Sequence, residues 1–255
     1  MSQRMREPSF SVGIEEEYLL ADQESRDLIT FVPPLPPEML SRCERLLEGR
    51  VAPEFLQCQI EVGTRVSGSI GEARDDLAHL RGTVAEVAGE HGLGLIAAST
   101  HPFARWSRQE HTPEERYDML AQDMQGVARR LLIGGMHVRV GLDDDALRID
   151  LMNQCSYTLP HWRALSASSP FWEGRDTGLE SYRIALWNEL PRTGIPPAFD
   201  SVGEYELEVE VRVRTGVIED GTKPWWDVRP SARFPALEMR ICDDREALRR
   251  VVDRL

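Results

Sequence analysis

Polar side chains that could bind a metal or a phosphate recur every second residue in four segments of the chain. The sets are Glu15 and Glu17; Gln57, Gln59 and Glu61; His137 and Arg139; and Glu238 and Arg240. Apolar residues fill the positions between them, such as Ile60 and Val138. Because successive side chains of a β-strand point to opposite faces, residues two apart share a face. Each segment is therefore predicted to be a strand with one apolar face and one face of ligand-type side chains.

The composition of these polar faces favours a metal site over a solvent-exposed surface. An antiparallel sheet often shows one face to water, which is the simpler interpretation. Such faces usually mix Lys, Ser and Thr with acids, whereas the four sets contain none of these three types. Clustered carboxylates raise one another's pKa unless a cation lies between them, and carboxylate oxygens suit Mg²⁺ or Mn²⁺. We expect the polar face to hold such ions together with a polyphosphate.

Three further residues have alternative interpretations. Glu16 points to the opposite face from its neighbours, which predicts a structural role. His137 on its own is equally compatible with a hydrogen-bonded core histidine and with a ligand. Glu54 precedes Glu61 by seven residues, an odd separation that cannot share a face within one regular strand. Glu54 is therefore expected to act from the loop that leads into the strand.

The remaining pattern predicts one α+β domain over residues 1–255, without repeats or linkers. Predicted strands cover residues 10–20, 27–32, 55–66, 93–99, 136–142 and 234–242. Predicted helices cover residues 69–90, 112–132, 144–167, 178–190 and 245–255. Ser69 is the expected cap of the first helix, Thr112 with Glu115 forms the expected capping box of the second, and Pro160 is expected to bend or break the third. Residues 204–214 alternate like a strand, although we favour a helix there from the resemblance described below.

Bulk composition excludes several classes of protein. The formal net charge is −13, which argues against a nucleic-acid binder. The sequence contains no apolar run long enough for a membrane span, and we expect no signal peptide. The four cysteines are scattered, which suits reduced thiols in the cytoplasm. Lys223 is the only lysine, so cationic contacts to phosphate or carboxylate fall to arginine.

Six motifs together resemble the glutamate–cysteine ligase superfamily, most closely its bacterial type 2 branch of carboxylate–amine ligases. Gly13-Ile14-Glu15-Glu16-Glu17 resembles the Gly-x-Glu-x-Glu opening of that superfamily. The other motifs occupy residues 53–64, 135–138, 169–183, 225–230 and 237–243. They occur in the family's order over nearly the whole chain.

The resemblance implies an antiparallel sheet curled into a funnel with helices packed outside, like the catalytic fold of glutamine synthetase and the guanidino kinases. It implies Mg²⁺, or Mn²⁺, bridging ATP and an acid substrate. The implied metal ligands are Glu15, Glu17, Glu54, Glu61, His137 and Glu238. The implied contacts to the substrate carboxylate or the transferred phosphoryl group are Arg175, Arg183 and Arg240. The expected ATP contacts are Gln59, Thr64, Arg139 and Trp172.

The implied reaction activates a carboxylate with ATP and then forms an amide. For the parent reaction, L-glutamate, L-cysteine and ATP give γ-glutamylcysteine, ADP and phosphate through an acyl phosphate. The alternatives are a guanidino kinase-like phosphotransferase on the same fold and a catalytically reduced subunit. Small molecules are the expected partners, with no nucleic acid and no membrane.

Two departures from the family pattern affect this expectation. Many relatives have His-Val-His-Val where this chain has His137-Val138-Arg139-Val140, and we expect Arg139 to alter substrate choice. Family chains also continue beyond the final acidic motif. We therefore expect a homo-oligomer, or a partner that supplies the C-terminal portion.

Overall fold

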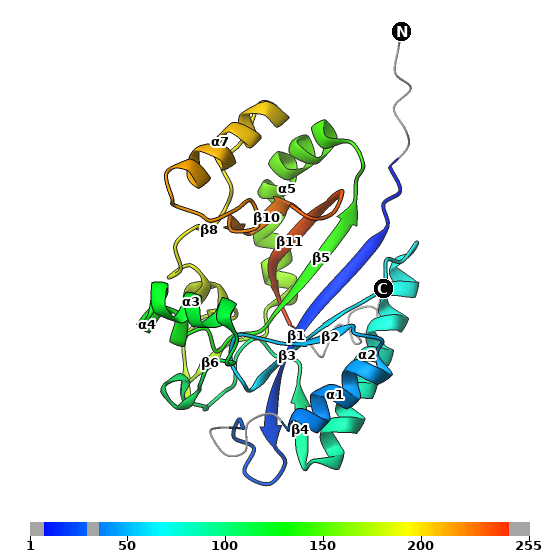
Figure 1. Ribbon diagram of the computed structural model, residues 1–255, viewed down its shortest axis with the longest axis vertical. Helices are drawn as coiled ribbons and strands as arrows, with labels where there is room; N and C mark the ends of the chain where they lie inside the picture. The colour runs from blue at the N-terminus through cyan, green and yellow to red at the C-terminus, as the bar shows by residue number, and fades with distance from the viewer. Residues whose placement is uncertain (1–7, 30–35, 245–255) are drawn as a thin grey trace.

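The chain folds into a β-sheet with packed helices. The computed structural model describes residues 8–29 and 36–244 (Figure 1). Its main sheet has seven strands in the order β10-β11-β5-β1-β3-β2, with β4 also paired to β1, and every pairing is antiparallel. The strands are β1 (Val12–Asp22), β2 (Val51–Pro53), β3 (Gln59–Gly63), β4 (Leu93–Ile96), β5 (Gly135–Gly141), β10 (Val228–Pro230) and β11 (Ala236–Asp243). The predicted α+β class with an antiparallel sheet is confirmed.

Helices and two small sheets complete the described part of the domain. The helices are α1 (Pro37–Leu46), α2 (Ile70–Glu90), α3 (Glu115–Met124), α4 (Gly126–Arg129), α5 (Asp145–Ser166), α6 (Tyr182–Trp187) and α7 (Val202–Arg214), with a 3₁₀ turn η1 (Trp106–Arg108). The small sheets pair β6 (Phe171–Trp172) with β7 (Arg175–Asp176) and β8 (Thr193–Gly194) with β9 (Trp225–Trp226). Within the described ranges, no helix has both the length and the apolar character that crossing a bilayer requires.

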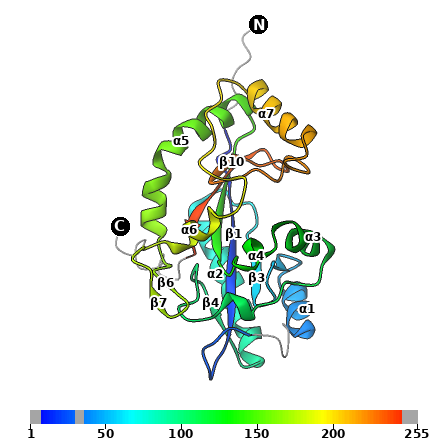
Figure 2. The same ribbon diagram turned by 90° about the vertical axis from the view of Figure 1, so that its left-hand side faces the viewer.

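Helices cover the apolar face of the sheet. Helices α1 and α2 pack on Tyr18 and Leu20 of β1 and on Ile60 and Val62 of β3, all fully buried. Helix α5 packs on the apolar side chains of β10 and β11, and Figure 2 shows it on the opposite side of the sheet from α3 and α4. The burial of this face holds the strands in register and leaves their polar side chains on the other face.

A buried ion pair lies within this apolar layer. Glu16 is completely buried and accepts a hydrogen bond from Arg81 Nε of α2 at 2.7 Å. A second nitrogen of Arg81 and the hydroxyl of Tyr18 also donate to the Glu16 carboxylate. The expected structural role of Glu16 is therefore confirmed, because its charge joins β1 to α2.

The β2–β3 turn corrects one predicted strand. Residues 55–58 form a turn and not the start of a strand, so Gln57 leaves the shared polar face, and its backbone N–H donates to Glu110 at 3.0 Å. Glu54 directly follows β2, and its N–H donates to the carbonyl of Gln59 at 3.3 Å. The turn therefore places Glu54 beside β3 from outside the strand, as its odd spacing from Glu61 predicted.

The predicted helix over residues 112–132 is wrong in both extent and capping. Helix α3 begins at Glu115 and ends at Met124, where Gln125 has φ 43° and interrupts the path before the short α4. Thr112 does not cap it, because its hydroxyl donates to the carbonyl of Glu54 at 2.5 Å. A tertiary contact thus takes the hydroxyl that the capping box required.

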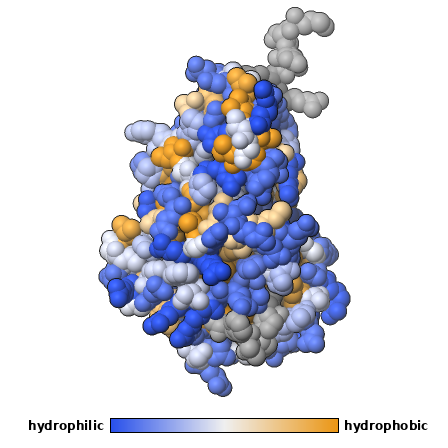
Figure 3. All heavy atoms as spheres, turned by 60° about the vertical axis from the view of Figure 1, so that its left-hand side comes forward, coloured by the Kyte–Doolittle hydropathy of each residue, from blue (hydrophilic) through white to orange (hydrophobic). Residues whose placement is uncertain are grey.

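Other elements follow the prediction in part. Ser69 caps α2 as expected, accepting from the N–H of Glu72 at 3.2 Å. Helix α5 runs unbroken through Pro160, and α6 is shorter than the predicted 178–190. The favoured helix over 204–214 is confirmed: α7 is capped by Ser201 and has no buried residue, so its alternating valines lie at the surface. Figure 3 shows apolar surface at the end of the molecule where α7 lies.

Three segments complete the comparison with the prediction. Helix α1 was not predicted, because its sequence begins among prolines. The predicted strand over 27–32 is represented by one bridge between Ala21 and Leu28, and its last residues lie outside the described ranges. The predicted helix over 245–255 lies wholly outside them.

Replacing Arg81 by methionine should destabilise the chain by about 3–5 kcal/mol, because the Glu16 carboxylate would stay buried without its guanidinium. Urea unfolding followed by circular dichroism measures this change. The exposed pair of Arg74 and Asp75 provides the control, and Arg74→Met should change the free energy of unfolding by less than about 1 kcal/mol. Equal effects of the two variants would contradict the structural role of Glu16.

Candidate functional site

Strand register brings the predicted polar faces side by side on the face opposite α2 and α5. The direct cross-strand neighbours are Glu15 with His137, Glu17 with Glu61, and Arg139 with Glu238. Side chains of directly opposed residues lie within contact distance. The alternation seen in four separate segments therefore produces one continuous polar surface across β3, β1, β5 and β11.

Two groups of potential metal ligands form on this surface. The first cluster is Glu15, His137 and Glu238, and the second cluster is Glu17, Glu54 and Glu61. Within each cluster, one ligand atom per residue lies within 4.8 Å of the others. The structure thus gathers all six predicted metal ligands, three to a cluster, although their role as ligands stays a prediction.

Arginines surround the first cluster. Glu238 accepts from Arg229 Nε at 2.7 Å and from Nη atoms of Arg139 and Arg240 at 3.1 Å each. Arg139 also donates to Glu15. Burial by itself raises the pKa of Glu238, but Arg240 and Arg229 hold it well below the usual range of a carboxyl group.

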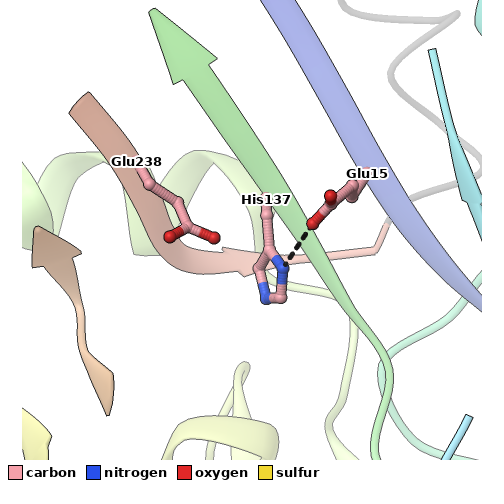
Figure 4. Close-up of side chains that lie close together, drawn as sticks. All are labelled: Glu15, His137 and Glu238. Carbon is pink, nitrogen blue, oxygen red and sulfur yellow. Dashed lines mark ion pairs between the residues drawn. The ribbon is translucent and has the colours of Figure 1, made fainter. Parts of the chain in front are cut away.

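The other two members of the first cluster respond to the same charges. Burial opposes ionisation of Glu15, but the nearby His137 and the hydrogen bond from Arg139 lower its pKa to about 2. Burial, reinforced by Arg240, lowers the pKa of His137 to about 4. At neutral pH this imidazole is therefore uncharged. Figure 4 shows His137 between the two carboxylates, with Nδ1 at 3.6 Å from an oxygen of Glu15.

The second cluster has only longer-range compensation, from Arg183 and Arg240 at Glu17, from Arg116 and Arg240 at Glu54, and from Arg139 at Glu61. Glu17 accepts from the N–H of Gly135 at 2.9 Å, and Glu54 accepts from the N–H of Phe55 at 2.7 Å. Among the described residues, no arginine forms an ion pair with Glu17, Glu54 or Glu61. Three neighbouring carboxylates without a counterion need either protons or a cation.

Burial and mutual repulsion raise the pKa of all three carboxyl groups in the second cluster. The pKa of Glu17 rises to about 8, first through burial and then through the charge of Glu54. The pKa of Glu61 lies well above its ordinary value, first through burial and then through the charges of Glu15 and Glu54. Burial also raises the pKa of Glu54. Carboxylate oxygens in this arrangement fit a hard divalent cation such as Mg²⁺.

Two of the predicted arginines lie against a tryptophan that was not predicted. Arg183 and Arg240 have their guanidinium carbons 5.8 Å and 5.4 Å from the ring centre of Trp187. Only 2% of the surface of Arg183 is exposed. Its Nη1 donates a hydrogen bond to the carbonyl of Arg240 at 3.1 Å. A side chain at Gly135 would place its Cβ 2.1 Å from Arg183, so a larger residue here would displace the Arg183 guanidinium. The buried Arg183 therefore fixes the backbone of Arg240 through this hydrogen bond.

The third predicted arginine lies elsewhere. Arg175 is exposed in the β6–β7 hairpin, and among the described residues no side chain forms an ion pair with it. The structure does not join it to either cluster through a contact.

The expected ATP contacts have structural tasks in this fold. Gln59 donates to the carbonyl of Ile133 at 2.7 Å and accepts from the N–H of Leu56 at 3.2 Å, so both ends of its buried amide bond to the backbone. Trp172 is buried in the core and packs on Tyr182. The hydroxyl of Thr64 accepts from the N–H of Ile14 at 2.9 Å. Gln59 and Trp172 are buried and Arg139 bonds to carboxylates, and the role of these side chains in ATP binding stays a prediction.

A buried aspartate was missed by the sequence analysis. Asp243 accepts hydrogen bonds from Ser169 Oγ at 2.7 Å, from Ser181 Oγ at 2.9 Å and from the N–H of Ser168 at 3.0 Å. Ser169 Oγ in turn accepts from the N–H of Arg183 at 3.1 Å. This network fixes Arg183 relative to the end of β11. The serines at positions 166, 168 and 169 were the available signal.

Without divalent ions, the free energy of unfolding should fall as pH rises from about 4.5 to about 8. Glu17 keeps its proton in the folded chain up to a pKa of about 8 but loses it near 4.5 when unfolded. The folded chain therefore binds more protons in that window, and stability falls by up to about 1.4 kcal/mol per pH unit. Glu17→Gln cannot ionise and should flatten the fall.

Urea unfolding in EDTA across this pH window measures both slopes. Glu86→Gln, at an exposed position of α2, is the matched control and should keep the slope of the unsubstituted chain. Identical slopes for Glu17→Gln and the control would show that Glu17 titrates normally.

Comparisons with known proteins identify the family of this chain. Residues 11–253 match the family described as "Glutamate-cysteine ligase family 2(GCS2)". The protein named "Putative glutamate--cysteine ligase 2" of Rhodospirillum rubrum is 58% identical over 244 residues, which are 94% of this chain and 62% of that protein. The protein of the same name from Ruegeria pomeroyi is 58% identical over 92% of this chain and 60% of its own length. The chain thus spans about three-fifths of the length of these relatives.

Solved structures share the fold at low sequence identity. A glutamate–cysteine ligase from Francisella tularensis, in complex with AMP, has a TM-score of 0.65 and 13% identity over 93% of this chain and 62% of its own. A bifunctional glutathione synthetase from Pasteurella multocida has a TM-score of 0.63 and 15% identity over 91% of this chain and 35% of its own. These two likenesses show the fold, and the match over residues 11–253 shows the family. The chain belongs to glutamate–cysteine ligase family 2.

Proposed function

We propose that this chain carries the catalytic sheet of an ATP-dependent ligase that joins a carboxylic acid to an amine. The observation that supports this most directly is the convergence of six potential ligands, from separate segments, into two clusters on one sheet face. Phosphoryl transfer depends mainly on positioned positive charge, which such a face provides through arginines and bound cations. The names of the relatives support the same activity.

The second cluster is the proposed place for Mg²⁺, with Mn²⁺ as an alternative. Glu17, Glu54 and Glu61 offer oxygen ligands, and no guanidinium of the described residues forms an ion pair with them. When bound, the ion would neutralise charge on the phosphoryl oxygens of ATP. The N–H of Gly135 and the N–H of Phe55 orient two of the three carboxylates toward that position.

The arginines around the first cluster supply fixed positive charge, and the Trp187 ring packs against one of them. Arg240 is held by Glu238 and lies over the Trp187 ring, and the carbonyl of Arg240 is bound by Arg183. A planar guanidinium in such a fixed place suits a carboxylate or phosphate group. We therefore assign Arg240 to the acid substrate or the transferred phosphoryl group, with Arg183 as the residue that positions it.

The proposed reaction has two steps. A carboxylate oxygen of the acid attacks the γ-phosphorus of ATP, and ADP leaves. The amine nitrogen then attacks the carbonyl carbon of the acyl phosphate, and phosphate leaves with the bonding pair while the nitrogen loses a proton. No protein nucleophile is required, which agrees with the burial of Cys58.

The relatives' names favour L-glutamate as the acid and L-cysteine as the amine, with γ-glutamylcysteine as the product. Four free cysteines support a reducing compartment and hence the cytoplasm. Association with a second copy or a partner chain stays a prediction, which light scattering of the purified chain would test.

Glu61→Gln should lower turnover by at least about 100-fold, because it removes one charge from the proposed ion site next to the phosphoryl group. The assay follows ADP, free phosphate and amide product with ATP, Mg²⁺ and a panel of amino acids. Glu86→Gln is again the control and should retain activity. Turnover in the unsubstituted chain that yields ADP and a phosphorylated acceptor without free phosphate would identify a phosphotransferase instead, and normal turnover of Glu61→Gln would remove the second cluster from the mechanism.

A further inference from the structure

The two clusters differ in the positive charge that the chain itself places on them. In the first cluster, both oxygens of Glu238 already accept from guanidinium groups: Oε1 from Arg139 and Arg240, and Oε2 from Arg229. In the second cluster, the only protein donors described for the carboxylates are the N–H groups of Gly135 and Phe55.

Arg139 lies between the two acids of the first cluster. One of its Nη atoms bonds to Glu15 and the other bonds to Glu238 at 3.1 Å. Its position is fixed by the strand register, which pairs residue 139 with Gly13 of β1 and with Glu238 of β11. The guanidinium therefore bridges the same two carboxylates that a bound ion would have to bridge.

A divalent cation fits the first cluster poorly. To bind an ion, the carboxylate oxygens of this cluster would have to give up their charge-assisted hydrogen bonds to arginine. The ion would then lie beside three guanidinium groups, which repel it. The two carboxylates of this cluster face three arginines, so their formal charge is already more than balanced. The second cluster has three carboxylates and no ion-paired arginine.

We propose that the Arg139 guanidinium is the resident cation of the first cluster, and that divalent ions bind the free chain only at the second cluster. This rests on the proposed function for one point, that the second cluster binds a divalent ion. The nearby Nε atoms of Arg139 and Arg240 are buried without a hydrogen-bond partner among the described residues. The first cluster thus offers N–H donors to an anionic substrate group. A metal ion at the same place would instead offer open coordination positions.

Counting Mn²⁺ ions bound by the full chain without nucleotide tests this directly. Electron paramagnetic resonance of free Mn²⁺ during titration gives the number of ions per chain. We expect one ion in the unsubstituted chain, lost in Glu17→Gln and retained in Glu238→Gln. Arg139→Met should gain a second ion, and this gain should disappear in the double variant Arg139→Met with Glu238→Gln.

Three controls separate charge from folding. Arg139→Lys keeps the positive charge and should bind one ion, whereas Arg139→Gln is neutral and should bind two, which provides a second route if the methionine variant is unstable. Arg50→Met removes an arginine from the half-buried pair with Asp76 and should leave the count at one. Thermal unfolding by circular dichroism identifies the folded variants.

The outcomes distinguish this inference from the proposed function. An ion in the unsubstituted chain that disappears in Glu238→Gln but persists in Glu17→Gln would overturn the inference, as would the absence of a gain in both neutral variants of Arg139. Ion binding that is unaffected by Glu17→Gln and Glu61→Gln would instead contradict the proposed metal site. A gain in Arg139→Met that depends on Glu238 would still support the inference in that case.

Discussion

Repulsion between like charges on one sheet face is the constraint on which the rest of this structure depends. Glu15, Glu17, Glu61 and Glu238 lie on neighbouring strands, and Glu54 joins them from the β2–β3 turn. Carboxylates this close stay ionised together only with a counterion. The chain provides guanidinium groups at one end of the face and leaves the other end to protons or a cation.

Packing on the opposite, apolar face of the sheet stabilises this arrangement of charges. Tyr18, Leu20, Ile60 and Val62 bury the apolar side of β1 and β3 under α1 and α2, and α5 covers β10 and β11 in the same way. These contacts hold the strands in a register that the carboxylates alone would oppose. The backbone then presents charged groups in fixed positions, so a reacting phosphoryl group would meet charges that need little reorganisation.

How far the sequence predicts this site depends on whether a feature is local. The period of two residues in the strands was sufficient to place Glu15, Glu17, Glu61, His137 and Glu238 on one face, because alternation is a property of the backbone. Tertiary contacts decided the rest. Gln59 shares that face, yet its amide is satisfied by two backbone groups, and the hydroxyl of Thr112 bonds to Glu54 in place of capping a helix. The packing of Arg183 against Gly135 has no signature in a single sequence, because its two members lie 48 positions apart.

Arginine is well suited to neutralise carboxylates on such a sheet face. Its guanidinium stays charged at any pH at which the chain is folded, and it satisfies two carboxylates through separate nitrogens, as Arg139 does. A metal ion in the same place would dissociate, would exchange with solvent and would demand its own coordination geometry. A chain that combines both kinds of cation on one sheet gains a permanent anchor for anions at the first cluster and an exchangeable centre at the second.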